Sequence, residues 1–496
     1  MSELPEGWTT CKVDQIFESF SGGTPSKSKA SYWTGKIPWI SSGEFNSNLI
    51  NEGTEFISKD GLENSSAKLC RPGSVIVVVR SGILKHTLPV AIVGKELAIN
   101  QDIKCFDSGD DEINRWLFLS LKKSAREILS LNREGTTVQS VKYDTLKEHE
   151  LVLPPPSEQR RIIAKLEKLL SRVNAAQQRL ATIPRILKRF RQSVLAAACS
   201  GRLTADWRAT HYEIETGTDL LSRILKERYL KWIGTNRTNK ISQYLEPATA
   251  DQSSLPDLPN AWATTTIEAL LRDDNALSYG ILKPGEYNPS GIPMLRVMDI
   301  GDGKLNDTKI FRVTPSLAEE YKRTKLKAND ILLAVMATVG RSMVVPAHLI
   351  GANVNRALAV LRLTELIDAS FACMVIRSPH FQDVFASEKI GSAQLRINLG
   401  DLRRFAFPLP PLAEQQEIVR RVEALFKTTD ALEARYRSAK AHIDKLTQSI
   451  LAKGFRGELV PQDPNDEPAS VLLKRIEQDS LAQGKGGKKV TRNDVR

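Results

Sequence analysis

A long helical pattern that occurs twice is the feature that most constrains the fold of this chain. The letters LPPPSEQ at residues 153–159 open the first pattern, and LPPLAEQ at 409–415 open the second. Behind each opening, apolar residues recur at gaps that alternate between four and three. A 3.5-residue period keeps one stripe of a helix facing a partner helix, which is typical of left-handed coiled coils. Because two matching stripes can pack on each other, the sequence predicts a covalently fused, pseudo-twofold dimer.

The apolar positions predict which residues form the contact seam between the two helices. In the first helix they are Ile162, Leu166, Leu169, Val173, Leu180, Leu187 and Phe190, and in the second Ile418, Val422, Leu425, Leu432, Tyr436, Ile443 and Leu446. Gly201 is a natural stop for the first helix, and the second helix is expected to begin near Pro411. Pro184 falls inside the first helix alone and is expected to bend it or split it.

Shorter motifs extend the duplication beyond the helices. LPEGW at 4–8 recurs as LPNAW at 258–262, and GSVIVVV at 73–79 answers NDILLAV at 329–335. The two apolar runs after turn signals are predicted to be buried strands. Outside the helices the halves match only at such scattered framework positions. We expect Trp8 and Trp262 to pack within this framework rather than to stack on a ligand.

These patterns predict an α+β fold in which globular units alternate with long helices. Two pseudo-twofold-related α/β domains would be separated by two long helices packed as an antiparallel coiled coil, with a rod of about 60 Å from roughly 40 residues at 1.5 Å each. The predicted segments are a first globular domain at 1–152, a first helical region at 153–239, a linker at 240–257, a second globular domain at 258–408, a second helical region at 409–480 and a basic flexible tail at 481–496.

Composition limits the classes of function that suit this chain. The net charge is +12, and the excess of cations is concentrated in the first helix, which suits a polyanionic partner. No run approaches the roughly 18 apolar residues of a membrane span, and the N-terminus lacks the pattern of a signal peptide. The five cysteines form no CxxC pair, which favours free thiols in a reducing compartment. The expected location is therefore the cytoplasm.

Catalytic and metal-binding motifs are missing from the sequence. SGGTPSKS at 21–28 departs from the GxxxxGK[ST] pattern of a phosphate loop, and the six histidines show no HExxH or similar spacing. We therefore expect neither catalytic residues nor metal ligands, and a chain that binds and positions rather than reacts.

The duplicated motifs, taken in order, resemble the specificity subunit of type I restriction–modification systems. Further matches are QSVLA at 192–196 with QSILA at 448–452, and SGRLT at 200–204 with RGELV at 456–460. The resemblance implies two target-recognition domains that each bind one half of a bipartite DNA site, and helical regions that dock two modification subunits. It also implies that S-adenosylmethionine binds to the modification partners, that ATP and Mg²⁺ bind to motor-nuclease subunits, and that this chain carries no cofactor itself.

Candidate DNA-binding residues follow the predicted strands and loops of the two domains. A glycine loop offers backbone amides and cations to phosphates through Gly22, Gly23, Thr24, Lys27 and Lys29. Cations just past the ends of buried strands are well placed for base edges or phosphates: Arg80, Lys85 and Arg341. Matching positions in the two domains carry Asn100 with Gln101 and Asn355 with Arg356, which suit base recognition but can equally cap turns. The remaining candidates are Gln139, Lys283, Arg296 and Arg396.

Two other classes of function remain open at this point. The first is an autonomous DNA-modifying enzyme, either a methyltransferase or a nuclease, for which the sequence offers no catalytic motif. The second is a coiled-coil scaffold whose globular ends bind other proteins. The duplicated order of domain and helix, together with the basic charge, favours DNA recognition over both.

Overall fold

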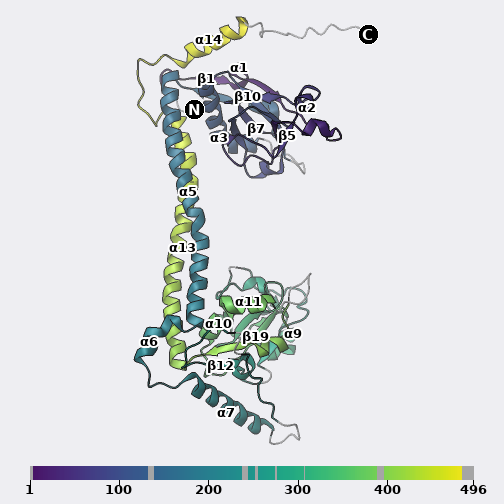
Figure 1. The fold of residues 1–496 in the computed structure, drawn as a ribbon, viewed down its shortest axis with the longest axis vertical. Coiled ribbons are helices and arrows are strands. Elements are labelled where there is room, and N and C mark those ends of the chain that lie inside the picture. The colour runs from purple at the N-terminus through teal and green to yellow at the C-terminus, as the bar shows by residue number, and fades with distance from the viewer. Residues whose placement is uncertain are drawn as a thin grey trace. The chain divides into compact units, whose positions relative to one another are not determined.

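The computed structural model describes residues 4–131, 139–236, 244–251, 255–273, 276–306, 308–387 and 396–482 (Figure 1). They form two compact units, of which the first combines Met1–Ala181 with Ser438–Arg496 and the second is Thr182–Arg437. Each unit therefore contains a part of both long helices. Most of the predicted basic tail and part of the predicted linker (240–243 and 252–254) lie outside the described residues.

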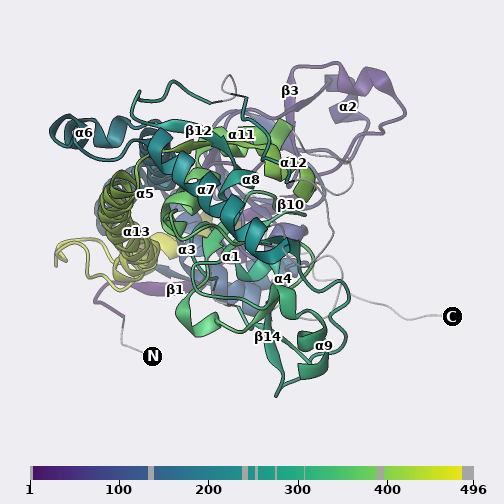
Figure 2. The ribbon, with the colours of Figure 1, turned by 90° about the horizontal axis from the view of Figure 1, so that it is seen from below.

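The two long helices are α5 (Pro156–Cys199) and α13 (Leu412–Gly454), and within each unit they run antiparallel (Figures 1 and 2). In the first unit the start of α5 shares a core with the end of α13, where Leu166 approaches Gly454. In the second unit the end of α5 shares a core with the start of α13, where Val194 and Val422 are both buried. The predicted antiparallel pairing is confirmed.

The end of α5 confirms the predicted stop at Gly201, whereas one of the two outcomes expected at Pro184 is contradicted. Gly201 and Gly457, just beyond the two helices, each have a φ of +73°, the left-handed conformation that ends helices at glycine. Pro184 lies inside α5, which continues through it as one helix. The expected split is therefore wrong, since a proline removes a single backbone donor and a long helix supported by a neighbour tolerates that loss. The alternative, a bend at Pro184, stays a prediction.

Burial agrees with the predicted seam between the helices at most positions and disagrees at three. Buried seam residues are Ile162, Leu166, Val173, Ile418 and Val422, and half-buried ones are Leu169, Leu180, Leu187, Leu425, Tyr436 and Ile443. Phe190, Leu432 and Leu446 are 42%, 47% and 42% exposed, so their assignment to the seam is corrected. In the second unit, Arg191 turns inward instead and pairs with Asp430 and Glu433. A helix of 3.6 residues per turn drifts from a strict 3.5-residue pattern, which moves the contact to the next residue.

The first unit is built on three sheets beside α5 and α13. They are the pair β1 (Thr9–Lys12) and β11 (Glu150–Leu153), the five-stranded order β2 (Glu18–Ser21), β10 (Ile103–Asp107), β7 (Val75–Val78), β8 (Val90–Val93) and β4 (Leu49–Ile50), and the four-stranded order β5 (Glu55–Ile57), β3 (Ile37–Ile40), β9 (Leu97–Ile99) and β6 (Leu69–Cys70). The helices are α1 (Val13–Ile16), η1 (Ala30–Trp33), α2 (Lys59–Glu63), η2 (Gly82–Lys85), α3 (Asp111–Ser130), α4 (Tyr143–Lys147) and α14 (Ala469–Ala482). Every residue of β7 is buried, as predicted.

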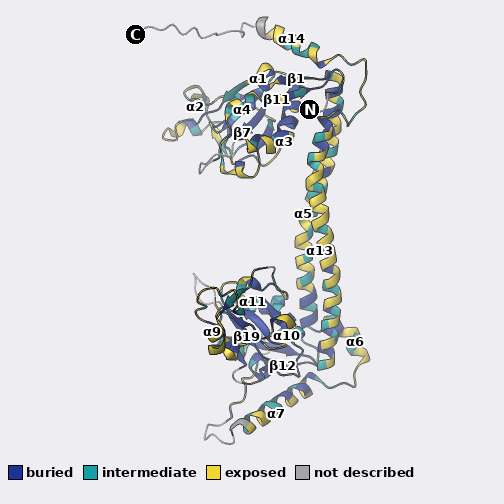
Figure 3. Cartoon of the chain, turned by 180° about the vertical axis from the view of Figure 1, so that it is seen from behind, coloured by how far each residue is buried: buried dark blue, intermediate teal, exposed yellow. Residues whose placement is uncertain are grey.

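The second unit repeats this plan with shorter sheets. They are the pair β12 (Ala263–Thr266) and β20 (Ala406–Leu409), the order β13 (Leu277–Tyr279), β19 (Leu358–Leu361), β16 (Ile331–Ala334) and β17 (Ser342–Val344), and the order β15 (Phe311–Val313), β14 (Ile292–Leu295) and β18 (Asn353–Val354). The helices are η3 (Arg202–Thr204), α6 (Ala205–Thr210), α7 (Gly217–Asn236), α8 (Ile267–Leu270), η5 (Val297–Asp299), α9 (Pro315–Glu320), η6 (Lys322–Thr324), η7 (Ala347–Leu349), α10 (Ala369–Arg377), α11 (Pro379–Ser387) and α12 (Leu399–Arg404). The predicted strand β16 is fully buried, and burial is concentrated in the sheets of each unit (Figure 3).

The duplicated motifs meet each other inside each unit. The indole Nε1 of Trp8 donates to Glu158 over 3.0 Å, and that of Trp262 donates to Glu414 over 2.8 Å. All four side chains are buried. The tryptophan of each LPxxW motif is thus joined to the glutamate of a PPxxEQ-type motif, and the prediction that both tryptophans belong to the framework is confirmed.

No helix among the described residues combines the length and apolar character that crossing a bilayer requires.

Candidate nucleic-acid interface

In the first unit, three chain segments meet at the end of β7. Val79 donates its backbone N–H to Asp102, and Val141 donates to Val79, both over 2.8 Å. The next residue, Arg80, forms a β-bridge with Ser140, and Ser81 donates to the carbonyl of Gln139. The fold therefore brings together three candidates that are far apart in the sequence. We call Arg80, Gln101 and Gln139 the first strand-end cluster.

The second unit repeats the same backbone arrangement at the end of β16. Val335 donates to Ala357 and accepts from Ile397, both over 3.0 Å, and Met336 bridges Arg396. Arg356, directly before Ala357, and Arg396 are exposed, and they form the second strand-end cluster together with Met336. Met336 thus occupies the position that Arg80 has in the first unit, and Arg356 occupies the position of Gln101. The loops before Gln139 and Arg396, at 132–138 and 388–395, lie outside the described residues.

The glycine loop of the first unit has a packing role that corrects the expected one. A Cβ on Gly22 would lie 1.9 Å from the carbonyl oxygen of Ile99. The N–H of Gly22 donates to Ile103 and that of Gly23 to Ile99. Both amides are therefore engaged within the protein and are not free for a phosphate. Glycine is required here because the backbone passes so close to β9.

A matching glycine in the second unit was missed by the sequence comparison. A Cβ on Gly280 would lie 2.0 Å from the carbonyl oxygen of Val354, and the next residue, Ile281, donates to that same carbonyl over 2.8 Å. In the structure Gly280 directly follows β13, as Gly22 directly follows β2. Lys283, which is exposed, lies three residues after this glycine.

Thr24 connects the glycine loop to the first strand-end cluster, whereas the two loop lysines are held elsewhere. The Thr24 hydroxyl donates to the Gln101 side chain over 2.6 Å. Lys27 lies 3.5 Å from the ring centroid of Trp33 and pairs with Glu55. Lys29 pairs with Asp60, and its ammonium group lies 4.1 Å from the ring centroid of Tyr32. Hydrogen bonding to Tyr32 is the largest cause of the raised pKa of Lys29, and Asp60 adds to it. Carboxylates of the unit thus neutralise both ammonium groups.

The paired asparagines differ in their surroundings. Asn100 is buried, and its Oδ1 accepts from the N–H of Asp102 over 3.1 Å, so the turn-capping alternative is confirmed there. Asn355 is half-buried, and its Oδ1 has no hydrogen-bond partner among the described residues. Asn100 therefore shapes the turn that presents Gln101, while Asn355 keeps an unused acceptor beside Arg356.

Arg296 and Arg341 are more constrained than the sequence indicated. Arg296 donates from Nε and Nη2 to the buried carboxylate of Asp299 over 3.1 and 3.0 Å, and Nη2 also donates to the Lys309 carbonyl. This two-point grip holds Arg296 within its own unit. Arg341 is half-buried in the turn between β16 and β17, and its carbonyl accepts from Ala334. Lys85, at the end of η2, is exposed.

The chemistry of the two clusters suits recognition of bases and phosphates. Guanidinium groups bind guanine edges and phosphates, and glutamine amides suit adenine. The first cluster offers one guanidinium and two amides, and the second offers two guanidiniums beside an apolar side chain. The described residues contain no group of three or more His, Cys, Asp or Glu side chains that could hold a metal ion.

This duplicated fold, with unlike cation and amide clusters on a common backbone frame, defines a class of two-part nucleic-acid-recognition proteins. A family model described as "Type I restriction modification DNA specificity domain" matches residues 5–185 and 280–440, which is more than half of the chain. The chain belongs to this family.

Named relatives and a solved structure agree with the family match. The EcoBI type I restriction enzyme specificity subunit of Escherichia coli is 32% identical over 405 residues, covering 79% of this chain and 77% of that protein. The EcoKI specificity subunit of Escherichia coli strain K12 is 27% identical over 526 residues, covering 99% and 98%. A chain solved in a study of complex assembly and conformational transition of the type I R-M system has the same fold, with a TM-score of 0.65, 20% identity, and coverage of 92% of this chain and 100% of that one.

The resemblance stated from the sequence motifs is confirmed, and so is the function of a specificity subunit. The family is one of DNA specificity rather than of catalysis, and the relatives carry the name of specificity subunits. The alternatives of an autonomous enzyme and of a coiled-coil scaffold are therefore not favoured.

Proposed function

We propose that this chain binds a bipartite, asymmetric DNA target, with one half-site for each recognition domain. The domains are the segments 1–152 and 258–408, and the helical regions 153–239 and 409–480 link them. One observation carries the proposal: the two units share a backbone frame at their strand ends but place different side chains on it. A shared frame with unlike donors and acceptors recognises unlike bases.

The differences between the two clusters support an asymmetric target. Arg80 in the first unit corresponds to Met336 in the second, so a cation is replaced by an apolar group. Gln101 corresponds to Arg356, so an amide is replaced by a guanidinium. Under the canonical pairings, the amide favours adenine and the guanidinium favours guanine. Two identical half-sites would not satisfy both clusters.

The same proposal extends to partners and cofactors. The relatives are named as subunits of restriction enzymes, which implies DNA together with modification and restriction subunits as partners. We place the docking of two modification subunits on α5 and α13, where Ile186, Phe190 and Leu432 are 57%, 42% and 47% exposed. Exposed apolar side chains on a helix are typical of a surface that a partner covers. S-adenosylmethionine would then be bound by the modification subunits, and ATP and Mg²⁺ by the restriction subunits.

Methylation mapping tests the proposal most directly. A genome that carries this chain with its modification partner should show methylated adenines in one split sequence with two different halves and a fixed gap. The matched control carries the partner alone and should show none of this pattern. Methylation spread evenly over sequences, or a single uninterrupted site, would contradict the proposal.

A change in helix length tests whether the two domains act as separate modules. Inserting seven residues at matching points of α5 and α13 should lengthen the gap and leave both half-sequences unchanged. Seven residues preserve the seam, because the apolar pattern repeats every seven residues. Altered half-sequences in the same mapping assay would show that the domains do not bind independently.

A further inference from the structure

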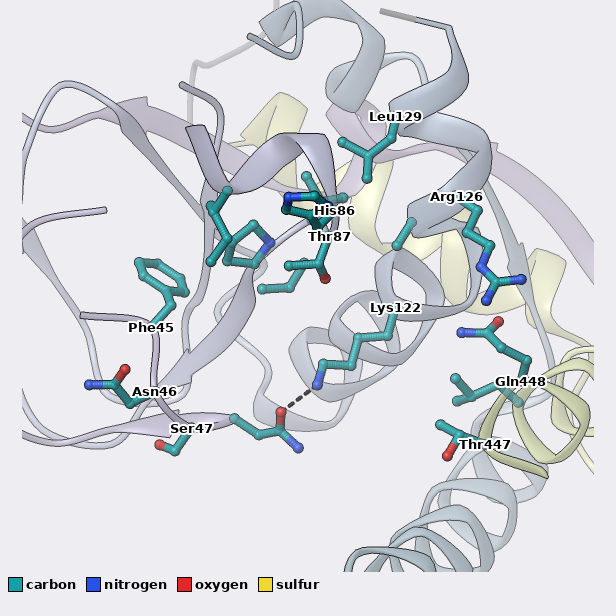
Figure 4. A pocket seen from close by; sticks show the side chains of 17 residues that line it. Phe45, Asn46, Ser47, His86, Thr87, Lys122, Arg126, Leu129, Thr447 and Gln448 are labelled. Atoms are coloured by element: carbon teal, nitrogen blue, oxygen red, sulfur yellow. Dashed lines mark hydrogen bonds between the residues drawn. The ribbon is translucent and has the colours of Figure 1, made fainter. Parts of the chain in front are cut away.

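The first unit contains a cavity of about 460 Å³ beside α3 (Figure 4). Its walls come from the segment before β4, from residues 83–90, from α3 and from the end of α13. None of its 17 lining residues is an aspartate or a glutamate. The cavity does, however, contain Lys122, Arg126 and His86. A cavity that holds cationic side chains and no carboxylate is suited to an anionic group.

Of the two cationic side chains, Lys122 and Arg126, Lys122 is the more constrained, since Arg126 is exposed. Its ammonium group lies 4.9 Å from the ring centroid of Phe118 and donates to the Asn48 side chain. Burial lowers its pKa, and no carboxylate among the described residues offsets that effect. An ammonium group has three N–H donors, and a partly buried one is stabilised by a negatively charged acceptor. Lys122 is therefore placed to hold an anion inside the cavity.

The rest of the lining supplies neutral hydrogen-bonding groups around this cation. Asn46 and Ser47 stand on one side, and Thr447 and Gln448 stand on the other, next to Arg126 (Figure 4). Hydrogen-bonding groups on more than one wall suit an anion with oxygens in several directions, as phosphate has. A planar carboxylate would use fewer of them.

We propose that this cavity binds a phosphate group, with Lys122 and Arg126 as its cationic contacts. Two sources supply that chemistry, namely a phosphodiester of bound DNA and a free phosphate or nucleotide. The chain itself points to the first, because Ile83 and His86 of the lining follow directly from Arg80 of the first strand-end cluster. Only this choice of source rests on the proposed function. The sequence pattern singled out neither Lys122, which is half-buried, nor Arg126, which is exposed.

The first experiment measures binding of inorganic phosphate to the full chain by isothermal titration calorimetry at constant ionic strength. The variant is Lys122→Met, which removes the charge and keeps an apolar side chain of similar length beside Phe118. The matched control is Lys123→Met, the same change one residue further along α3 on an exposed side chain outside the cavity. We expect at least a tenfold loss of phosphate affinity in the first variant and an unchanged affinity in the control.

The second experiment measures the salt dependence of binding to a non-specific DNA duplex. Losing one phosphate contact lowers the slope of log K against log salt concentration by about 0.9. We expect that reduction in Lys122→Met and in Arg126→Gln, and not in Lys123→Met. Circular dichroism confirms that each variant is folded. Because the duplex carries no target, the result does not depend on the proposed bipartite recognition.

The two experiments together identify the source of the phosphate or overturn the proposal. A smaller slope in the cavity variants identifies a DNA phosphodiester. Loss of phosphate affinity with an unchanged slope identifies a free phosphate or nucleotide. If the cavity variants match the Lys123→Met control in both experiments, the cavity is not a phosphate site.

Discussion

Replacing Glu414 by glutamine should destabilise the second unit far more than the equivalent change at Glu158 destabilises the first. Glu414 is fully buried and accepts from Trp262 over 2.8 Å, from Thr204 over 2.7 Å and from Arg208 Nη2 over 2.7 Å. Arg208 Nε donates to the same carboxylate. The Arg208 side chain is only 20% exposed, so this is an ion pair largely shielded from water.

The expected magnitudes follow from those partners. Removing one member of a buried ion pair costs about 3–5 kcal/mol, because the remaining charge stays uncompensated. Glu158 accepts from Trp8 through one oxygen, while its other oxygen, Oε1, has no partner among the described residues. Changing one charge-assisted hydrogen bond to a neutral one costs about 1 kcal/mol. The two substitutions therefore differ by at least about 2 kcal/mol, although both residues occupy the same motif.

Hydrogen exchange measured by mass spectrometry resolves the two units separately. Glu414→Gln should lower protection in peptides covering β12 and β20 by at least about a hundredfold, since about 3 kcal/mol or more is lost and every 1.4 kcal/mol is a factor of ten. Glu158→Gln should lower protection in β1 and β11 by less than about tenfold. Each variant controls for the other, because the unit without the substitution should keep its protection. Equal losses in the two units would refute the argument that Arg208 and Thr204 make Glu414 the more critical residue.

Three further predictions concern packing, base recognition and pH. Gly22→Ala and Gly280→Ala should each lower the free energy of unfolding of their own unit by about 3 kcal/mol in denaturant titrations, because the added Cβ would overlap a neighbouring backbone carbonyl. Gly82→Ala is the control: its Cβ would meet no atom within 4 Å, so the change should be neutral. Arg356→Ala should relax the sequence preference of the second half-site alone, by about 1–3 kcal/mol per discriminated base in competition binding. Burial raises the pKa of Glu158 in the folded state. The free energy of unfolding should therefore be constant below the unfolded-state pKa of about 4.3 and should fall as the pH rises from there to the folded-state pKa, because only the unfolded state loses the proton in that range. Glu158→Gln should remove this fall in denaturation measured across the acid range.

Much of the framework could be predicted because its signals are local. An apolar period of 3.5 to 3.6 residues identifies a helix with one contact face, and α5 ends and α13 begins close to the predicted residues. The buried strands β7 and β16 follow from short apolar runs after turns. The seam failed at Leu432 and Leu446, where a drift of one residue decides which side chain faces the partner helix.

The candidate site was harder to predict because it depends on long-range contacts. The sequence marked Arg80 and Gln139 as candidate DNA-binding residues. It did not predict that their backbone segments would pair with each other. The same limit applies to Gly22, whose residue type was identified while its role was misassigned. A glycine that accommodates a neighbouring strand and a glycine that exposes its amide look alike in sequence, since both need a missing side chain.

By itself, the sequence of this protein determined the duplication, the two long helices, the buried strands and the family. Local periodicity, or motifs that repeat in the same order, predicts each of these features. Tertiary structure alone decided that Trp8 bonds Glu158 and Trp262 bonds Glu414, across 150 and 152 residues. It also decided which polar side chains gather at the strand ends and which lysine lines the cavity. The physical reason is that a side chain's partners and burial are set by segments brought together in folding, and no local pattern records them.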